Sequence, residues 1–133
     1  MKRILKRGWI FIKHEELTEE IIGSAYEVFN YMNFGYMESV YEECLLKELT
    51  ARDLKAESQV PLQVDYKGEK VGEYFADIMV EGVVILELKS VRTLERSHEI
   101  QLVSYLTSTG IDVGLLINFG PGGVQIKRKT RTL

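Results

Sequence analysis

The sequence predicts an α/β sandwich, in which helices flank a central mixed β-sheet. Apolar residues recur at helical spacing up to about residue 52, and the period changes to two between Gln59 and Lys89. A third helical stretch then joins the strand that ends at Lys89 to an apolar strand that begins at Val113. Such a connection joins parallel strands through a right-handed crossover, so we expect a mixed sheet that packs against helices.

Three helices are expected. The first is capped by Thr18, carries acidic residues in its first turn and ends near residues 33–35. The second covers about residues 37–52 and places its apolar side chains on one side. The third runs from about residue 94 to 109 and stops at Gly110, a residue type that favours helix C-termini.

The strands fall into two groups, one before and one after the third helix. Pro61 lies near the start of the first strand and indicates an edge position, because proline cannot donate a hydrogen bond to a neighbouring strand. The expected strands and turns, in chain order, are a strand through Val60–Val64, a turn at Lys67-Gly68, a strand through Tyr74–Val80, a turn at Glu81-Gly82, a strand through Val83–Lys89, a strand over Val113–Asn118, a glycine-rich loop over 119–123 and a strand over Val124–Arg128.

Charge is unevenly spread along the 133 residues, which fit one domain over 17–133 preceded by a basic N-terminal extension over 1–16. Residues 1–13 carry five basic groups and no acid, and four more basic groups follow Val124. These ends form a phosphate-binding surface if the fold brings them together, and otherwise they are solvated termini. A net charge of −3 argues against a dedicated high-affinity nucleic-acid binder.

The single cysteine, Cys44, excludes an intramolecular disulfide and a multi-cysteine zinc site. Its place among apolar helical residues indicates a core position. No segment approaches the roughly 18 apolar residues of a membrane span, and the apolar patch after the basic start is too short for a secretory signal. These features predict a cytoplasmic protein.

Three ionisable residues interrupt two apolar strands. Glu87 follows four apolar residues and shares one strand face with Lys89, while Asp77 ends an apolar run on the partner strand of the hairpin. The alternative is an exposed strand end with an ion pair. Buried charge is costly unless it is paired or bound to a metal, so we favour a site in which both carboxylates share a divalent cation. A lysine beside them suggests phosphodiester hydrolysis.

Further candidates lie on the helices. Gln101 and Tyr105 are four residues apart on the third helix and share one of its faces, an arrangement that is also typical of a polar helix face. Because this helix directly follows the Glu87–Lys89 strand, we expect its first two turns to overhang the site. Glu38 lies in the first turn of the second helix, where the helix dipole alone would favour an acid. His98 is not assigned as a metal ligand.

These residues resemble a known family. Gly35-Tyr-Met-Glu38-Ser-Val-Tyr41 resembles the signature of the GxxExxY proteins, a branch of the PD-(D/E)XK nuclease superfamily. Asp77 followed by Glu87-Leu-Lys89 is similar to the core motif of that superfamily, and Gln101-Leu-Val-Ser-Tyr105 to the QxxxY motif of its lambda-exonuclease-like members. The resemblance covers about residues 17–128. It departs at Asn30, where a histidine is usual, and at Asn33, where a glycine is usual.

The resemblance implies a restriction-endonuclease-like fold and a metal-dependent nuclease acting on DNA. Asp77 and Glu87 would bind Mg²⁺ or Mn²⁺, with the backbone carbonyl of Leu88 and the carboxylate of Glu38 as further ligands. Lys89 would orient the attacking water or stabilise the transition state. Gln101 would position the water or a phosphate, and Tyr105 would hold its helix or contact the nucleic-acid backbone. The superfamily also contains members without activity, so the alternative is a catalytically inactive module that binds nucleic acid or a protein partner. Self-association into a homo-oligomer is a further possible arrangement.

Overall fold

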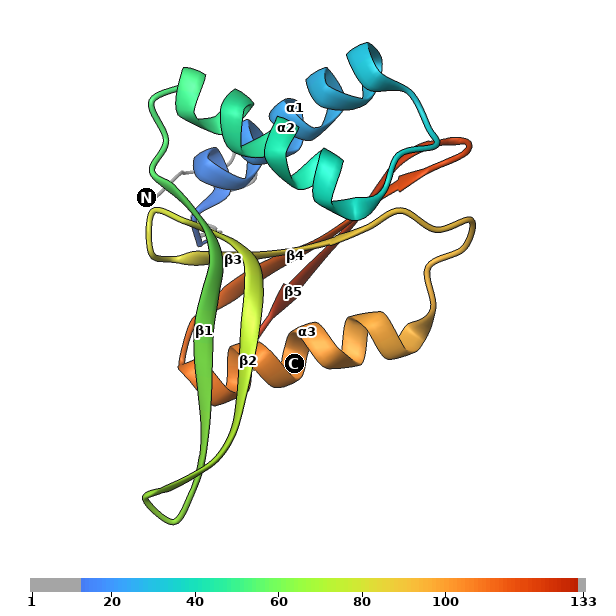
Figure 1. The fold of residues 1–133 in the computed structure, drawn as a ribbon. Helices are drawn as coiled ribbons and strands as arrows, with labels where there is room; N and C mark the ends of the chain where they lie inside the picture. Colours follow the sequence, from blue (N-terminus) through green and yellow to red (C-terminus); the bar gives the residue numbers. More distant parts are fainter. Residues whose placement is uncertain (1–12, 132–133) are drawn as a thin grey trace, which may run out of the picture.

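The computed structural model describes residues 13–131 and contains three helices and a five-stranded sheet (Figure 1). The elements in chain order are α1 (Glu15–Met32), α2 (Glu38–Ala51), β1 (Ala56–Tyr66), β2 (Glu69–Val80), β3 (Val84–Lys89), α3 (Arg96–Thr109), β4 (Val113–Gly120) and β5 (Gly123–Thr130). Residues 1–12 of the basic extension lie outside the described residues, and Glu15 and Glu16 form the first turn of α1.

The strands follow one another across the sheet in the order β1-β2-β3-β4-β5. Strands β3 and β4 are parallel, and every other neighbouring pair is antiparallel, so the predicted mixed α/β sheet is confirmed. The edge position predicted for Pro61 is also confirmed, because β1 lies at one end of the sheet. Both predicted turns are present, with positive φ at Lys67 and Gly68 and at Glu81 and Gly82.

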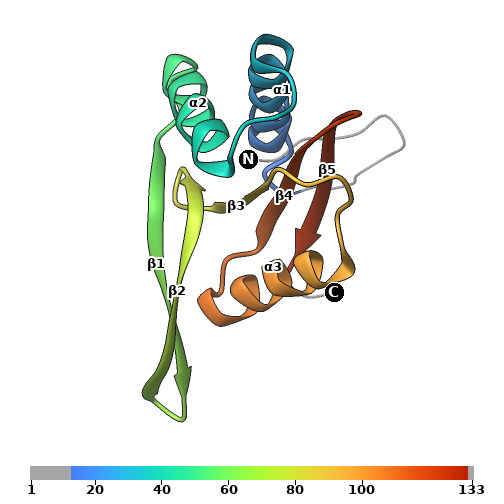
Figure 2. The same cartoon turned by 45° about the vertical axis from the view of Figure 1, so that its right-hand side comes forward.

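Helices cover both faces of the sheet (Figure 2). Helices α1 and α2 pack on one face around Leu45, Ile78 and Leu86, and α3 packs on the other around Ile85, Leu102 and Leu116. Strands β1 and β2 extend beyond this body as a two-stranded arm (Figure 1). Among residues 13–131, no helix has the length and hydropathy to cross a membrane.

The structure corrects the predicted start of the first helix. Helix α1 begins at Glu15 with His14 as its N-cap, so Thr18 lies inside the helix and is not its cap. The Thr18 hydroxyl donates to the Glu15 carbonyl at 3.0 Å and accepts from the Arg128 guanidinium at 3.2 Å. Because this partner is on β5, a tertiary contact occupies the side chain that local sequence marked as a cap.

The predicted glycine-rich loop over 119–123 is shorter than expected. Strand β4 runs to Gly120 and β5 begins at Gly123, so only Pro121 and Gly122 form the turn. Phe119 is buried and its ring stacks on Tyr41, with 4.3 Å between the ring centroids. Burial of this aromatic ring therefore extends the strand that the composition had suggested would end at Asn118.

Gly114 allows α3 to pack closely against the sheet, and its replacement is expected to weaken the fold. A Cβ atom at Gly114 would lie 2.8 Å from Leu102 Cδ1 of α3. We expect Gly114→Ala to lower the free energy of unfolding by about 1–3 kcal/mol in a urea titration, because the core must shift to accept the methyl group. Gly122→Ala is the matched control: no atom lies within 4 Å there, and we expect a change below about 0.5 kcal/mol. Equal midpoints for the two variants would contradict this account of the packing.

Candidate active site

Two carboxylates lie where β2 and β3 separate. The backbone ladder between these strands runs from Val80 paired with Val84 to Ile78 paired with Leu86. One step further, the Glu87 carboxylate accepts a hydrogen bond from the Asp77 backbone N–H at 3.0 Å. The Asp77 carboxylate accepts one from the Leu88 backbone N–H at 2.7 Å. The structure thus brings both predicted acids together, and each binds the backbone of the other strand.

A local irregularity in β1 and β2 sets the position of Asp77. Side chains alternate along a strand, yet Ala76 and Met79 both pack in the core beneath α3, which requires a break between them. The neighbouring residue of β1, Gln59, has a φ of 52°, in the left-handed region that residues with a side chain seldom adopt. Asp77 lies at this break, beside a backbone conformation of the kind that clusters at functional sites.

Glu87 is buried at a position that disfavours its charged form. It is 8% exposed, and it lies on the sheet face that α3 covers. Burial, and after it the charge of Asp77, raises its pKa to about 8, while the hydrogen bond from Asp77 N–H and the charge of Lys89 oppose the shift. A carboxyl group with this pKa holds a proton at neutral pH unless a cation takes the place of that proton.

Lys89 and Tyr105 complete the centre of the site. Lys89 lies two residues after Glu87, at the end of β3, and its charge acts on the Glu87 carboxyl group. Tyr105 of α3 is 7% exposed, and burial together with the charges of Glu87 and Asp77 raises the pKa of its hydroxyl group. Its ring also packs against Tyr74 of β2, with 5.1 Å between the ring centroids.

Gln101 and Glu38 lie further from the carboxylate pair. Gln101 is exposed one turn before Tyr105, and its amide makes no hydrogen bond within residues 13–131. Glu38 is exposed in the first turn of α2, where it lines an open hollow that also contains Ser90. In the part of the chain that the structure describes, no three His, Cys, Asp or Glu side chains converge as a metal site would require. The ligand role of Glu38 therefore remains a prediction.

Tyr41 explains how the segment before Glu38 is held. Its hydroxyl group donates a hydrogen bond to the Asn33 carbonyl and accepts one from the Tyr36 backbone N–H at 3.4 Å. The Tyr36 carbonyl in turn accepts a hydrogen bond from the Ser90 hydroxyl at 2.7 Å. The start of α2 is thereby tied to the residue that follows Lys89.

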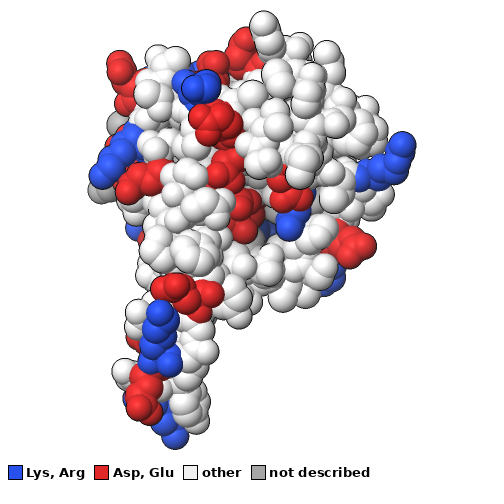
Figure 3. All heavy atoms as spheres, viewed as in Figure 1, with Lys and Arg blue, Asp and Glu red and all other residues white. Residues whose placement is uncertain are grey.

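Two residues beside the carboxylate pair, Glu42 and Gln59, were not predicted from the sequence. The Gln59 amide donates to Glu42 Oε1 at 3.0 Å and lies 3.5 Å from Asp77 Oδ1. The charge of Glu42 also acts on Glu87 and raises its pKa. Figure 3 shows acidic side chains running from the helices toward the middle of this face, with a basic group beside them. The sequence contains one signal for Glu42, because it follows Glu38 by four residues and so lies on the same side of the helix.

Comparison with known proteins identifies the superfamily of this chain and a solved structure with a similar fold. The family model described as "PD-(D/E)XK nuclease superfamily" matches residues 15–130. Among solved structures, the chain is similar to one titled "Crystal structure of SSO0001", with a TM-score of 0.56 and 17% sequence identity. That alignment covers 91% of this chain and 61% of the other, so the chain spans less than two thirds of its solved relative. A search of curated proteins finds no match. On the strength of the match over residues 15–130, the chain belongs to the PD-(D/E)XK nuclease superfamily.

Proposed function

We propose that this protein is a metal-dependent nuclease that hydrolyses phosphodiester bonds in DNA. The observation that carries the proposal is the pairing of the Asp77 and Glu87 carboxylates across diverging strands, with Lys89 beside them. Membership of a nuclease superfamily supports the same chemistry. The single cysteine is consistent with action in the cytoplasm.

The carboxylate pair fits a hard divalent cation. Each carboxylate uses one oxygen for a backbone N–H. Of the two remaining oxygens, Asp77 Oδ1 has a 3.5 Å contact with Gln59, and Glu87 Oε1 accepts no hydrogen bond from any described residue. Oxygen ligands of this kind suit Mg²⁺ or Mn²⁺, and we assign Asp77 and Glu87 as ligands, with the Leu88 carbonyl and Glu38 as additional ones. A bound ion would lower the pKa of a coordinated water and offset charge on the phosphate.

The remaining residues of the site act on the substrate. Lys89 lies two residues after Glu87 and its charge acts on that carboxyl group, so it would stabilise the charge that develops on the phosphate. Tyr105 fixes α3 against the base of the arm through its contact with Tyr74. The exposed amide of Gln101, one turn away, is available to orient the water or a phosphate oxygen.

A binding role is the second candidate, favoured by the arm. Tyr66, Val71 and Phe75 are all at least half exposed on β1 and β2. Exposed apolar side chains on one segment are typical of contact surfaces, and the partner would be nucleic acid, another protein or a second copy of this chain. This role and catalysis are distinguished by the experiment below.

Asp77→Asn is expected to lower cleavage at least 10²-fold and to weaken metal binding, because it removes a charged metal ligand. The measurements are hydrolysis of labelled DNA and RNA with Mg²⁺ or Mn²⁺, and calorimetric titration of the metal. Asp65→Asn, which changes an exposed carboxyl group on the arm, is the matched control and should behave as wild type. If wild type neither cleaves either nucleic acid nor binds metal, the catalytic proposal is wrong and the binding role remains.

A further inference from the structure

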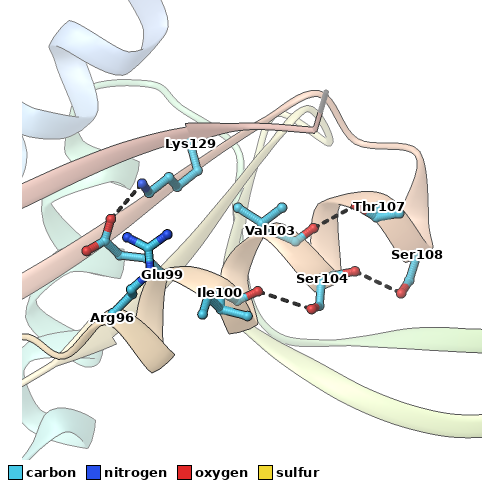
Figure 4. A pocket seen from close by; sticks show the side chains of 8 residues that line it. All are labelled: Arg96, Glu99, Ile100, Val103, Ser104, Thr107, Ser108 and Lys129. Atoms are coloured by element: carbon cyan, nitrogen blue, oxygen red, sulfur yellow. Dashed lines mark hydrogen bonds and ion pairs between the residues drawn. The ribbon is translucent and has the colours of Figure 1, made fainter. Parts of the chain in front are cut away.

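An open groove lies between α3 and β5, outside the site described above (Figure 4). It has a volume of about 630 Å³. Arg96 and Glu99 line it near the start of α3, Lys129 lines it from β5, and Ile100 contributes an apolar side chain that is 56% exposed. A surface with this mixture of cations and exposed apolar area suits an amphipathic anion rather than a free ion.

Three cations act on the Glu99 carboxylate, and two of them, Lys129 and Arg96, line this groove with it. Lys129 Nζ lies 2.6 Å from Glu99 Oε1, and the two side chains are only about one quarter exposed. Lys127 and Arg96 also act on Glu99, and together with Lys129 they lower the pKa of its carboxyl group. One negative charge therefore offsets only one of three positive charges, and the positive surplus attracts a further anion.

The α3 side of the groove is lined by small side chains that carry hydroxyl groups. Ser104, Thr107 and Ser108 are exposed, and each hydroxyl donates to the carbonyl four residues before it at 2.8–3.1 Å (Figure 4). Hydroxyl protons rotate to suit a new acceptor, so an incoming phosphate oxygen is able to take these hydrogen bonds. The small side chains also leave room for a chain to lie against the helix.

The groove lies on the same sheet face as the carboxylate pair. Glu87 pairs with Leu116 of β4, which pairs with Lys127 of β5, so the three residues form one row across the sheet. Two strand spacings place Lys127 about 10 Å from Glu87 between backbones. On α3, Ser104 follows Gln101 by three residues and Ser108 follows Tyr105 by three residues. Residues three apart are neighbours on a helix surface. One strand is thus able to contact both regions.

We propose that the groove between α3 and β5 binds the phosphate backbone of the nucleic acid on one side of the bond that is cut. Arg96, Lys127 and Lys129 are the cationic contacts, and Glu99 is an internal anion that the phosphate displaces. This inference rests on the proposed nuclease function. It names a binding surface that recognises the backbone and therefore carries no base specificity.

The test is the binding of a labelled 20-nucleotide DNA, single- or double-stranded, measured by fluorescence anisotropy in EDTA over a range of salt concentrations. The double variant Lys127→Gln/Lys129→Gln should bind roughly 60-fold more weakly at 0.1 M salt if both lysines neutralise duplex phosphates, and its salt slope should fall by about 1.8. Glu99→Gln should bind several-fold more tightly, because it frees the cations. The control Lys47→Gln/Lys55→Gln makes the same charge change on α2 and in the segment between α2 and β1, and should stay within about threefold of wild type.

The variants separate charge from structural damage. Glu99→Gln and Lys129→Gln both remove the same ion pair, yet the first should strengthen binding and the second weaken it. Three results would contradict the proposed role of the groove: equal weakening in both double variants, weaker binding by Glu99→Gln, or no binding by wild type. Because binding is measured without metal, loss of binding in the groove variant supports this inference even if wild type fails to cleave. If wild type cleaves DNA and the groove variant binds DNA as tightly as wild type, the role of the groove is wrong and the nuclease proposal stands.

Discussion

Lys89→Met is expected to lower the rate of phosphodiester cleavage by about 10²–10³-fold while leaving the protein folded. Methionine keeps most of the length of the side chain and removes its charge. Lys89 is the last residue of β3, two residues after Glu87, and its charge acts on the Glu87 carboxyl group. If Lys89 stabilises charge on the transferring phosphate, its loss should reduce kcat with a smaller effect on KM. Single-turnover cleavage of labelled DNA measures this rate directly.

Lys47→Met provides the control for Lys89→Met. Lys47 lies on α2, its side chain is 77% exposed, and it pairs only loosely with Glu43 at 3.7 Å. Its replacement changes the net charge by the same amount and should leave cleavage unchanged. Calorimetry should show that Lys89→Met still binds Mg²⁺ through the carboxylates. A Lys89→Met protein that is folded and cuts at the wild-type rate would exclude Lys89 from the chemistry.

Local sequence predicted the parts of the fold that local physics determines. The turns at Lys67-Gly68 and Glu81-Gly82 place a glycine next to a polar residue, and both adopt the positive φ angles that such turns require. The parallel pairing of β3 with β4 followed from the crossover helix between them. The start of α1 was predicted wrongly, because the Thr18 side chain contacts Arg128 of β5 and does not cap the helix. No local sequence pattern shows this contact.

Some residues of the candidate site were also predictable from the sequence, and others were not. Asp77, Glu87 and Lys89 stood out because charges interrupted apolar strands, and buried charge needs a reason. Gln59 did not stand out, because its role comes from a left-handed backbone conformation that its residue type does not favour. Glu42 resembled one more solvated acid on a helix until the fold placed its carboxylate on Gln59. Register and backbone conformation, rather than residue type, determined these two contacts.

Glu87 is expected to make the metal-free protein less stable as pH rises from about 5 to about 8. Burial, and after it the charge of Asp77, raises the folded-state pKa to about 8, against an ordinary value of 4.5 when the chain is unfolded. Between these values the folded state binds one more proton than the unfolded state, so the free energy of unfolding falls as pH rises. At pH 7 the loss is on the order of 3 kcal/mol, from about 1.4 kcal/mol per pKa unit. Below about pH 4.5 both states are protonated and the effect vanishes.

Glu87→Gln should remove this dependence. Glutamine keeps an oxygen that accepts from the Asp77 backbone N–H, and it cannot ionise. In EDTA at pH 8, we expect the variant to melt about 10 °C above wild type, and at pH 4.5 we expect the two melting temperatures to agree. Glu73→Gln, which alters an exposed acid on the arm, should follow the wild-type curve within the smaller effect of losing its 3.1 Å ion pair with Lys70.

Added metal should reverse the order of the two proteins. A divalent cation that binds ionised Glu87 and Asp77 replaces the proton, so Mg²⁺ should raise the melting temperature of wild type at pH 8 more than at pH 5. Glu87→Gln lacks one charged ligand and should gain little. Parallel pH profiles for the two proteins in EDTA would show that Glu87 does not titrate as its burial implies. Profiles with Mg²⁺ that diverge just as they do in EDTA would instead show that the carboxylate is buried for a reason other than metal binding. The two conditions therefore test the electrostatic state of Glu87 and its proposed ligand role separately.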